Sequence, residues 1–244
     1  MEKIHIVTYA THSDGLLDKL KNNKYNKEIE ILGWGTKFNT YIDKIKYVNK
    51  YIENKKNNDI LIYIDGFDTL INRNFTYYEL KKLFLKYKTK ILISEDPGNL
   101  YFITNKYIAN KIYNNIFGNF SNNDKPNMGM FMGYIKELKE LCKCIISQNI
   151  DDDQKALLKC YKNIKIDKNK EIFLNTKYNY YIKNKNKIKS IFVSFPFGFT
   201  NTKYDNNRIS RYFILELKYY KYCIFIIIIL ILLILLILFR KNFF

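Results

Sequence analysis

Histidine and arginine are scarce in this chain of 244 residues. The only histidines are His5 and His12, and arginine occurs only at positions 73, 208, 211 and 240. Arginine is the side chain best suited to reading bases and phosphates. Because lysine carries most of the formal net charge of +18, that charge does not by itself indicate a nucleic-acid partner, and we expect none.

Cysteine is present but lacks the spacing of a metal site. Cys142, Cys144, Cys160 and Cys223 form no C-x-x-C pair, and both histidines lie far from them in sequence. Structural zinc sites use such spacings, so we expect no zinc. One cysteine lies in an apolar run and the others in or beside a helix-like region. We therefore expect reduced, buried thiols, typical of a reducing compartment.

Long apolar runs are absent until the end of the chain, where 18 residues at 222–239 read YCIFIIIILILLILLILF. A helix of that length just crosses a hydrocarbon core of ~30 Å, and the run lacks a polar stripe. We expect a single membrane-spanning helix there, with a basic linker at 201–221 and a tail at 240–244. No secretory signal is recognisable at the amino terminus, so we expect a membrane-anchored protein whose main domain is cytosolic.

The remaining residues, 1–200, have the pattern of one α/β domain. Hydrophobic residues form 48% of the chain, which excludes extensive disorder. Apolar runs rich in Ile and Val alternate with segments of helical periodicity, which predicts a mostly parallel central sheet covered by helices. Strands are expected at 4–8, 28–32, 60–64, 90–94, 128–135, 171–174 and 190–194, and helices at 41–53, 77–87, 105–116, 136–147 and 152–160.

Two carboxylates end one of these buried strands. Asp65 and Asp68 lie three residues apart, and Gly66 between them permits a sharp turn. Ligands of open α/β sheets bind outside the carboxyl ends of strands, and hard oxygen ligands suit Mg²⁺ or Mn²⁺. A pair of aspartates that only caps a helix or opens a turn would have the same spacing, so the pattern alone leaves both interpretations open.

Composition alone also leaves the interpretation of two further motifs open. The strand N-M-G-M-F-M-G-Y at 127–134 has glycines four residues apart, where a ligand or another backbone can approach closely. The run D-D-D-Q at 151–154 begins a helix, so Asp152 and Asp153 either carry chemistry or simply favour the helix amino terminus.

Seven segments in chain order carry a family resemblance: V-T-Y-A-T at 7–11, G-W-G at 33–35, I-D-G-F-D at 64–68, S-E at 94–95, N-M-G-M-F-M-G-Y at 127–134, D-D-D-Q at 151–154 and I-F-L-N at 172–175. In sequence and spacing they resemble the glycosyltransferase domain of the procollagen lysyl hydroxylase family over residues 4–200. The resemblance implies a GT-A type fold that binds a UDP-sugar through Mn²⁺ or Mg²⁺ and transfers the sugar to a hydroxyl, which in the family belongs to hydroxylysine or its galactosyl derivative.

Roles are carried over from the resemblance residue by residue. Asp65 and Asp68 match the metal-binding carboxylates. Asp153, with Asp152 before it, matches the acidic residues of the acceptor side, where it would orient or deprotonate the acceptor hydroxyl. The remaining matches are residues that would bind the donor nucleotide and its phosphates: Thr8, Phe38, Lys44 and Phe67. Asp65 is assigned to this donor-binding group as well.

The chain departs from the family pattern in three places. The family's third metal ligand is a histidine, whereas the corresponding stretch here, 192–198, contains Ser194. Residues 39–43 replace a glycine-rich segment, and no part of the chain resembles the family's hydroxylase domain. The leading hypothesis is a membrane-tethered glycosyltransferase acting on a protein or glycan hydroxyl. The alternatives are a catalytically degenerate, membrane-tethered scaffold and a basic protein that binds anionic lipid or nucleic acid.

Overall fold

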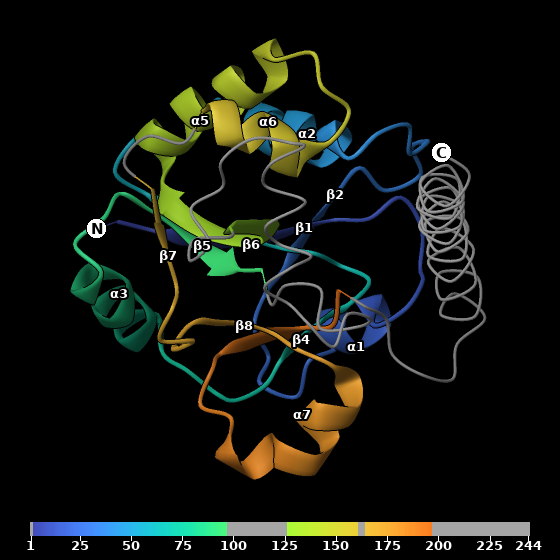
Figure 1. Cartoon of the computed structure of the whole chain (residues 1–244), viewed down its shortest axis with the longest axis vertical. Coiled ribbons are helices and arrows are strands. Elements are labelled where there is room, and N and C mark those ends of the chain that lie inside the picture. The colour runs from blue at the N-terminus through green and yellow to red at the C-terminus, as the bar shows by residue number, and fades with distance from the viewer. Residues whose placement is uncertain (1, 97–125, 161–163, 197–244) are drawn as a thin grey trace, which may run out of the picture. The chain divides into compact units, whose positions relative to one another are not determined.

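The computed structural model describes residues 2–96, 126–160 and 164–196, all within one compact unit of the chain, Met1–Phe199. Figure 1 shows the arrangement of the elements. The helix expected at 105–116 and the segments 201–221, 222–239 and 240–244 lie outside the described residues. Within the described ranges, no helix is long and apolar enough to cross a membrane.

A six-stranded sheet forms the centre of the described domain, in the order β2-β1-β3-β6-β5-β7. Five strands share one direction, and β6 runs against both of its neighbours. The strands are β1 (Ile4–Tyr9), β2 (Glu30–Leu32), β3 (Ile60–Ile64), β5 (Ile91–Glu95), β6 (Pro126–Tyr134) and β7 (Ile164–Ile166). The predicted α/β fold with a mostly parallel sheet is therefore confirmed.

One face of the sheet is covered by α2 (Ile42–Ile52), α5 (Ile135–Ser147) and α6 (Asp153–Lys159), which lie together at the top of Figure 1. Side chains alternate between the two faces of a strand, so β3 sends Leu61 and Tyr63 into this layer. They pack there with the buried stripes of the helices, represented by Ile45 and Leu138. This layer holds the larger apolar core and fixes α2 and α6 against the sheet.

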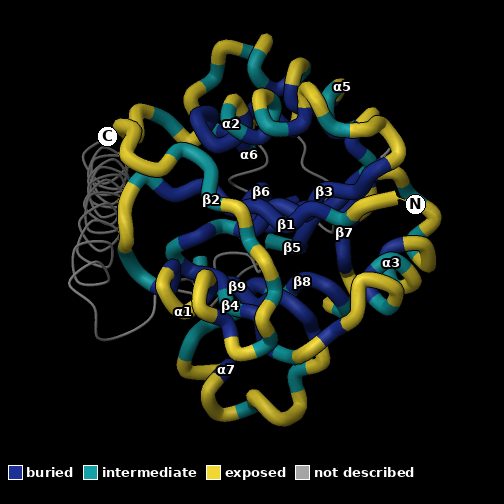
Figure 2. Tube along the Cα trace, turned by 180° about the vertical axis from the view of Figure 1, so that it is seen from behind, coloured by how far each residue is buried: buried dark blue, intermediate teal, exposed yellow. Residues whose placement is uncertain are grey.

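The opposite face packs on α3 (Tyr77–Lys86) and on a small second sheet. This second sheet has the order β4-β9-β8 and is made of β4 (Thr69–Ile71), β9 (Phe192–Ser194) and β8 (Phe173–Asn175). The remaining described elements are α1 (Leu17–Lys21), α7 (Tyr178–Asn184) and the short 3-10 helix η1 (Lys185–Lys187). Figure 2 shows the strands buried between these layers, with the outer faces of the helices exposed.

β6 runs antiparallel to both of its neighbours, unlike a strand that is reached through a parallel crossover connection. In the β5–β6 pairing, Glu95 at the end of β5 lies opposite Pro126 at the start of β6. The chain therefore leaves β5 and enters β6 at the same edge of the sheet, and β6 must run back across it. An apolar run has the same pattern in either direction, so the sequence did not reveal this reversal.

The expectation of reduced thiols is wrong for two cysteines. Cys144 of α5 and Cys160, which follows α6, form a disulfide with their Cα atoms 5.9 Å apart. Cys142 is a free, buried thiol as expected, and burial raises its pKa to about 12. Cys223 lies outside the described residues. The error arose because helix pairing, which no spacing rule reports, brings Cys144 and Cys160 together.

Candidate active site

Asp65 directly follows β3 at the carboxyl edge of the central sheet. Its Oδ1 accepts a hydrogen bond of 2.8 Å from the Tyr63 hydroxyl, and its backbone N–H donates to the Gly129 carbonyl at 2.8 Å. The ring of Tyr63 is fully buried and stacks on Phe131 at 5.0 Å between centroids. Side chain and backbone of Asp65 are thus both fixed by the sheet, while about a third of the side chain stays exposed.

Lys44 brings a buried positive charge to this carboxylate. It lies in the first turn of α2, and its Nζ is 3.4 Å from Asp65 Oδ1 and 2.8 Å from Asp153 Oδ2. The side chains of Lys44 and Asp153 are 10% and 8% exposed. Such a buried ion pair is costly to break, because either partner left alone is an uncompensated charge in a poorly solvated site.

Burial and the neighbouring charges together shift the pKa values of three residues of the cluster. Burial alone would lower the pKa of Lys44, but the carboxylates of Asp153 and Asp65 outweigh burial and raise it, so the ammonium stays charged. Burial raises the pKa of Asp153, and Lys44 only partly offsets that effect. Burial, followed by the charge of Asp65, raises the pKa of Tyr63, which keeps its hydroxyl a donor.

The two aspartates that begin α6 have different tasks. Asp152 is the N-cap, and its Oδ1 accepts from the backbone N–H groups of Gln154 and Lys155, both at 3.0 Å. Asp153, one residue later, turns inward to Lys44. The capping role that the sequence left open thus belongs to Asp152, while Asp153 belongs to the charged cluster.

Asp68 is buried in the connection between β3 and β4. The Ser194 hydroxyl, at the end of β9, donates to Asp68 Oδ1 at 3.1 Å, and Phe195 N–H donates to the Asp68 carbonyl at 2.8 Å. The stretch that the resemblance matches to the family's histidine segment therefore lies beside Asp68. Asp68 also contributes to the electrostatic field that raises the pKa of Tyr63, after burial and the other two carboxylates.

Two glycines leave room around these groups. A Cβ on Gly129 would lie 2.8 Å from Asp65 Oδ2, and one on Gly66 would lie 2.8 Å from Thr8 Oγ1. Gly66 does not have a positive φ, so close approach rather than a sharp turn explains it. Thr8 is fully buried at the end of β1, and among the described residues its hydroxyl has no hydrogen-bond partner. This hydroxyl suits the donor-binding role inferred from the resemblance.

The two aromatic residues of the donor prediction make contacts outside the charged cluster. Phe38 is 48% exposed, and its ring meets Tyr41 at 5.7 Å between centroids. Phe67 is half-buried with its ring 5.4 Å from that of His12. The structure thus joins Lys44, Asp65 and Asp153 by direct contacts and leaves these rings as surfaces on which a base could stack.

Several residues that position the site were not predicted to be functional. Tyr63 could have been found, because strand periodicity places residues 63 and 65 on the same side. A second group connects β5, β6 and β8 through buried hydrogen bonds: Ser94 Oγ donates to the Asn127 carbonyl at 2.9 Å, and Asn175 Nδ2 donates to Ser94 Oγ at 3.0 Å. No local pattern in the sequence connects these three strands.

Comparison with known proteins identifies the family of this chain. A family model described as the PLOD GT domain matches residues 1–210. The chain belongs to that family. It is therefore a glycosyltransferase domain, and the family resemblance predicted from the motifs is confirmed.

Individual relatives of this PLOD-type domain are distant. The chain is 29% identical over 181 residues to the multifunctional procollagen lysine hydroxylase and glycosyltransferase of Caenorhabditis elegans, which covers 69% of this chain and 24% of that protein. The chain thus spans about a quarter of that relative.

Among solved structures, a glycosyltransferase involved in glycosylation of the major capsid of PBCV-1 is similar with a TM-score of 0.49 and 9% identity, covering 86% of this chain and 98% of that one. The galactosyltransferase LgtC is similar with a TM-score of 0.44 and 13% sequence identity. That match covers 79% of this chain and 88% of LgtC.

Proposed function

We propose that this chain transfers a hexose from a UDP-sugar to a hydroxyl acceptor, with a divalent ion at Asp65 and Asp68. The observation that carries the proposal is the Lys44 ammonium held between Asp65 and Asp153 at the carboxyl edge of the sheet. A buried cation fixed beside carboxylates is suited to a substrate whose phosphates gain negative charge as the reaction proceeds.

The residues present fit a divalent ion. Asp65, Asp68 and Asp153, when ionised, carry three negative charges against one on Lys44, which leaves a net charge of −2. The Tyr63 and Lys44 contacts of Asp65 both use Oδ1, and Gly129 leaves space beside Oδ2. Mg²⁺ and Mn²⁺ accept hard oxygen ligands and commonly keep waters and phosphate oxygens as further ligands.

Most of the coordination would come from the substrate. In the part of the chain that the structure describes, no group of three or more His, Cys, Asp or Glu side chains is placed to hold a metal. In this proposal, the Asp68 carboxylate and the neighbouring Ser194 hydroxyl replace the carboxylate and the histidine that bind the metal in the family. The bound ion would supply Lewis acidity that neutralises charge on the departing diphosphate.

The chain's own residues supply the rest of the chemistry. Lys44 places a permanent positive charge beside the donor phosphates, and Thr8 offers a hydroxyl to the nucleotide. The sugar's bond to UDP breaks and its bond to the acceptor oxygen forms, while the acceptor loses a proton. Asp153, whose pKa is raised by burial, is the group that orients this acceptor hydroxyl and takes its proton.

The acceptor and the location belong to the same proposal. The family resemblance suggests hydroxylysine or its galactosyl derivative in a collagen-like protein. Attachment to a membrane through residues 222–239, with the domain on the cytosolic side, stays a prediction because those residues lie outside the described part of the chain.

Calorimetric titration of the full-length protein with UDP, with and without Mn²⁺, tests the donor site. We expect binding that requires Mn²⁺ and that weakens at least about tenfold in an Asp65→Asn/Asp68→Asn variant, because each carboxamide removes one charge from the ion site. Asp18→Asn, at an exposed carboxylate of α1, is the matched control and should bind like the unmodified protein.

Sugar transfer is then measured as UDP release from UDP-galactose or UDP-glucose with a hydroxylysine peptide. Release that depends on the peptide and on Asp153 would support the full proposal. A well-folded protein that binds no UDP at millimolar concentration would contradict it and favour the scaffold hypothesis.

A further inference from the structure

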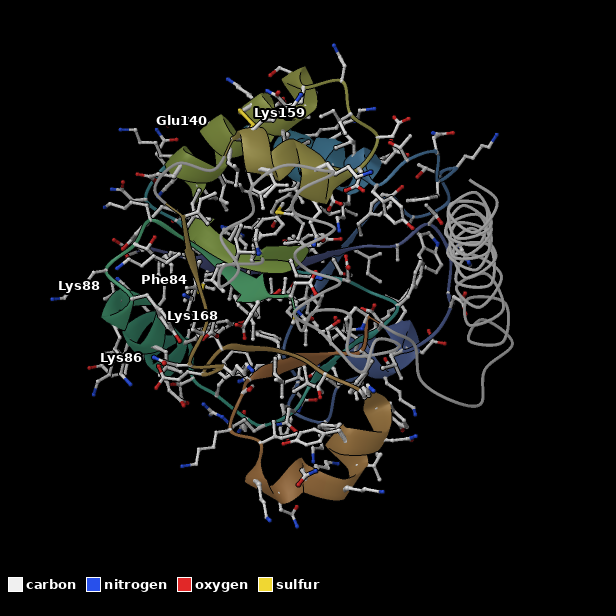
Figure 3. All side chains as sticks on the ribbon, viewed as in Figure 1. Phe84, Lys86, Lys88, Glu140, Lys159 and Lys168 are labelled. Atoms are coloured by element: carbon white, nitrogen blue, oxygen red, sulfur yellow. A yellow bond between two sulfur atoms is a disulfide. The ribbon has the colours of Figure 1, made fainter. Side chains whose placement is uncertain are left out.

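The Cys144–Cys160 disulfide fastens the helix that carries Asp153. The helix α6 has only seven residues, Asp153–Lys159, and Cys160 directly follows it. Cys144 is in the last turn of the longer α5. Figure 3 shows the disulfide between these two helices, near the labelled Lys159.

A helix this short needs external anchors. Isolated helices of fewer than about 12 residues are marginal in water, because nucleation fixes several residues for few hydrogen bonds. The buried residues of α6 are Asp153, Ala156 and Leu157, so its apolar contribution to the core is small. The disulfide supplies a covalent anchor at the carboxyl end, and the ion pair with Lys44 fixes the amino end.

The two anchors are linked through the helix to the donor site. If α6 moves, Asp153 leaves Lys44, whose other described carboxylate partner is Asp65 at 3.4 Å. Lys44 would then either draw closer to Asp65 or turn toward solvent. Both changes alter the charge beside the donor phosphates, and small displacements of catalytic groups are known to be costly.

We propose that Cys144 and Cys160 are positioning residues of the transfer reaction, which hold Asp153 beside Lys44 through their disulfide. The inference rests on the proposed function, because it assumes that Lys44 and Asp153 act at the donor site. A dithiol opens the bridge by supplying two electrons and two protons. The S–S bond breaks, Cys144 and Cys160 become thiols, and the reductant becomes a cyclic disulfide.

Whether this disulfide persists depends on the compartment in which the protein is located. Cytosolic thiol buffers keep most cysteines reduced, whereas secretory compartments preserve disulfides. Full transferase activity would therefore require an oxidising compartment or a bridge that resists cytosolic reductants. The predicted cytosolic placement and the observed disulfide make opposite demands on the site.

The test compares oxidised and dithiothreitol-treated full-length protein at a temperature where both are folded. We expect reduction to lower kcat/KM for the UDP-sugar by roughly 10- to 100-fold and reoxidation to restore it. A Cys144→Ser/Cys160→Ser variant should have the low value with or without reductant. Cys142→Ser, at the buried free thiol of the same helix, is the matched control and should respond to reductant like the unmodified protein.

A second readout does not depend on activity. The rate of chemical acetylation of the Lys44 ε-amine, measured by mass spectrometry, should rise at least about tenfold on reduction, because Asp153 no longer covers it. Unchanged acetylation of Lys44, or an unchanged kcat/KM in an active enzyme, would overturn the inference. If acetylation responds to reduction but no form binds UDP, the proposed function fails while the positioning of Asp153 by the disulfide stands.

Discussion

Lys44 is the residue on which the charged cluster depends. Its ammonium is shared by two carboxylates that come from different elements, the end of β3 and the start of α6. Sequence comparison predicted a lysine near the phosphates. Only the structure shows that this lysine also neutralises part of the acidic cluster and so allows several carboxylates to lie close together.

Tyr63→Phe tests the support of Asp65. The change removes one hydroxyl and keeps the ring that stacks on Phe131. Hydrogen bonds to charged groups contribute about 1.5–3 kcal/mol, so we expect kcat/KM to fall by roughly 10- to 100-fold. Steady-state kinetics, with a thermal melt to verify folding, measures this. Unchanged kinetics would show that the Tyr63 hydroxyl is not needed to orient Asp65.

Gly129→Ala tests the space beside Asp65 Oδ2. The new Cβ would lie 2.8 Å from that oxygen and from Asn127 Oδ1, which forces one of them to move. We expect Mn²⁺-dependent UDP binding to weaken at least about tenfold, as calorimetry would measure.

Gly133→Ala, in the same strand, is the control. Its Cβ would lie 2.9 Å from the Lys90 carbonyl, away from the carboxylates. This variant should lower the melting temperature with no selective loss of UDP affinity. Equal loss of UDP affinity in both variants would indicate general damage to β6 rather than a role for the space beside Asp65.

At the level of elements, α6 combines a capping residue with a charged-cluster residue in adjacent positions. Asp152→Ala should destabilise the protein by about 0.5–2 kcal/mol, because two backbone N–H groups of the first turn lose their acceptor. Asp152→Asn retains a capping oxygen and should keep both stability and activity. Denaturant unfolding and kinetics measure the two effects. An inactive but stable Asp152→Asn variant would show that the Asp152 charge takes part in catalysis.

Most elements of the described domain were predictable from apolar patterns, and a few were not. The strand expected at 60–64 is β3 residue for residue, and the helix expected at 41–53 differs from α2 by one residue at each end. Their apolar patterns extend over enough residues to establish a period. By contrast, β4, β7, α1 and α7 were missed, although the equally short strands β2, β8 and β9 lie within or beside the ranges expected at 28–32, 171–174 and 190–194.

At the scale of the whole molecule, a buried contact between a histidine and an aspartate lies at the amino ends of β1 and β3. His5 Nε2 is 3.3 Å from Asp59 Oδ2, and Asp59 Oδ1 accepts from the Lys3 backbone N–H at 2.9 Å. Burial by itself would raise the pKa of Asp59, but the Lys3 hydrogen bond and His5 outweigh burial and lower it.

This lowered pKa predicts a pH dependence of folding stability. The carboxylate stabilises the folded state above its unfolded pKa of about 4, and that contribution is lost as pH falls through the lower folded value. The free energy of unfolding should therefore decrease with acidification below about pH 4, and Asp59→Asn should reduce that decrease. Glu53→Gln, at an exposed position, should leave the profile unchanged. Identical profiles for all three proteins would contradict the assignment.

The sequence proposed three carboxylates for the candidate site but not the contacts that position them. Asp65, Asp68 and Asp153 lie in recognisable motifs. Tertiary packing sets the distance from Lys44 to Asp153, the pairing of Asp68 with Ser194 and the pairing of Cys144 with Cys160, and no local spacing encodes these contacts.

The direction of β6 has a consequence for how this domain can be altered. Glu95 and Pro126 are paired neighbours in the sheet, so the 30 residues between them begin and end at one place on the edge that carries the site. A segment with such coincident ends can be lengthened, shortened or exchanged without shifting the register of any strand. Chimeras that replace only 97–125 should therefore retain the frame of the domain, including the hydrogen bond of 3.1 Å that Gln154 Nε2 of α6 donates to Asp96 Oδ2.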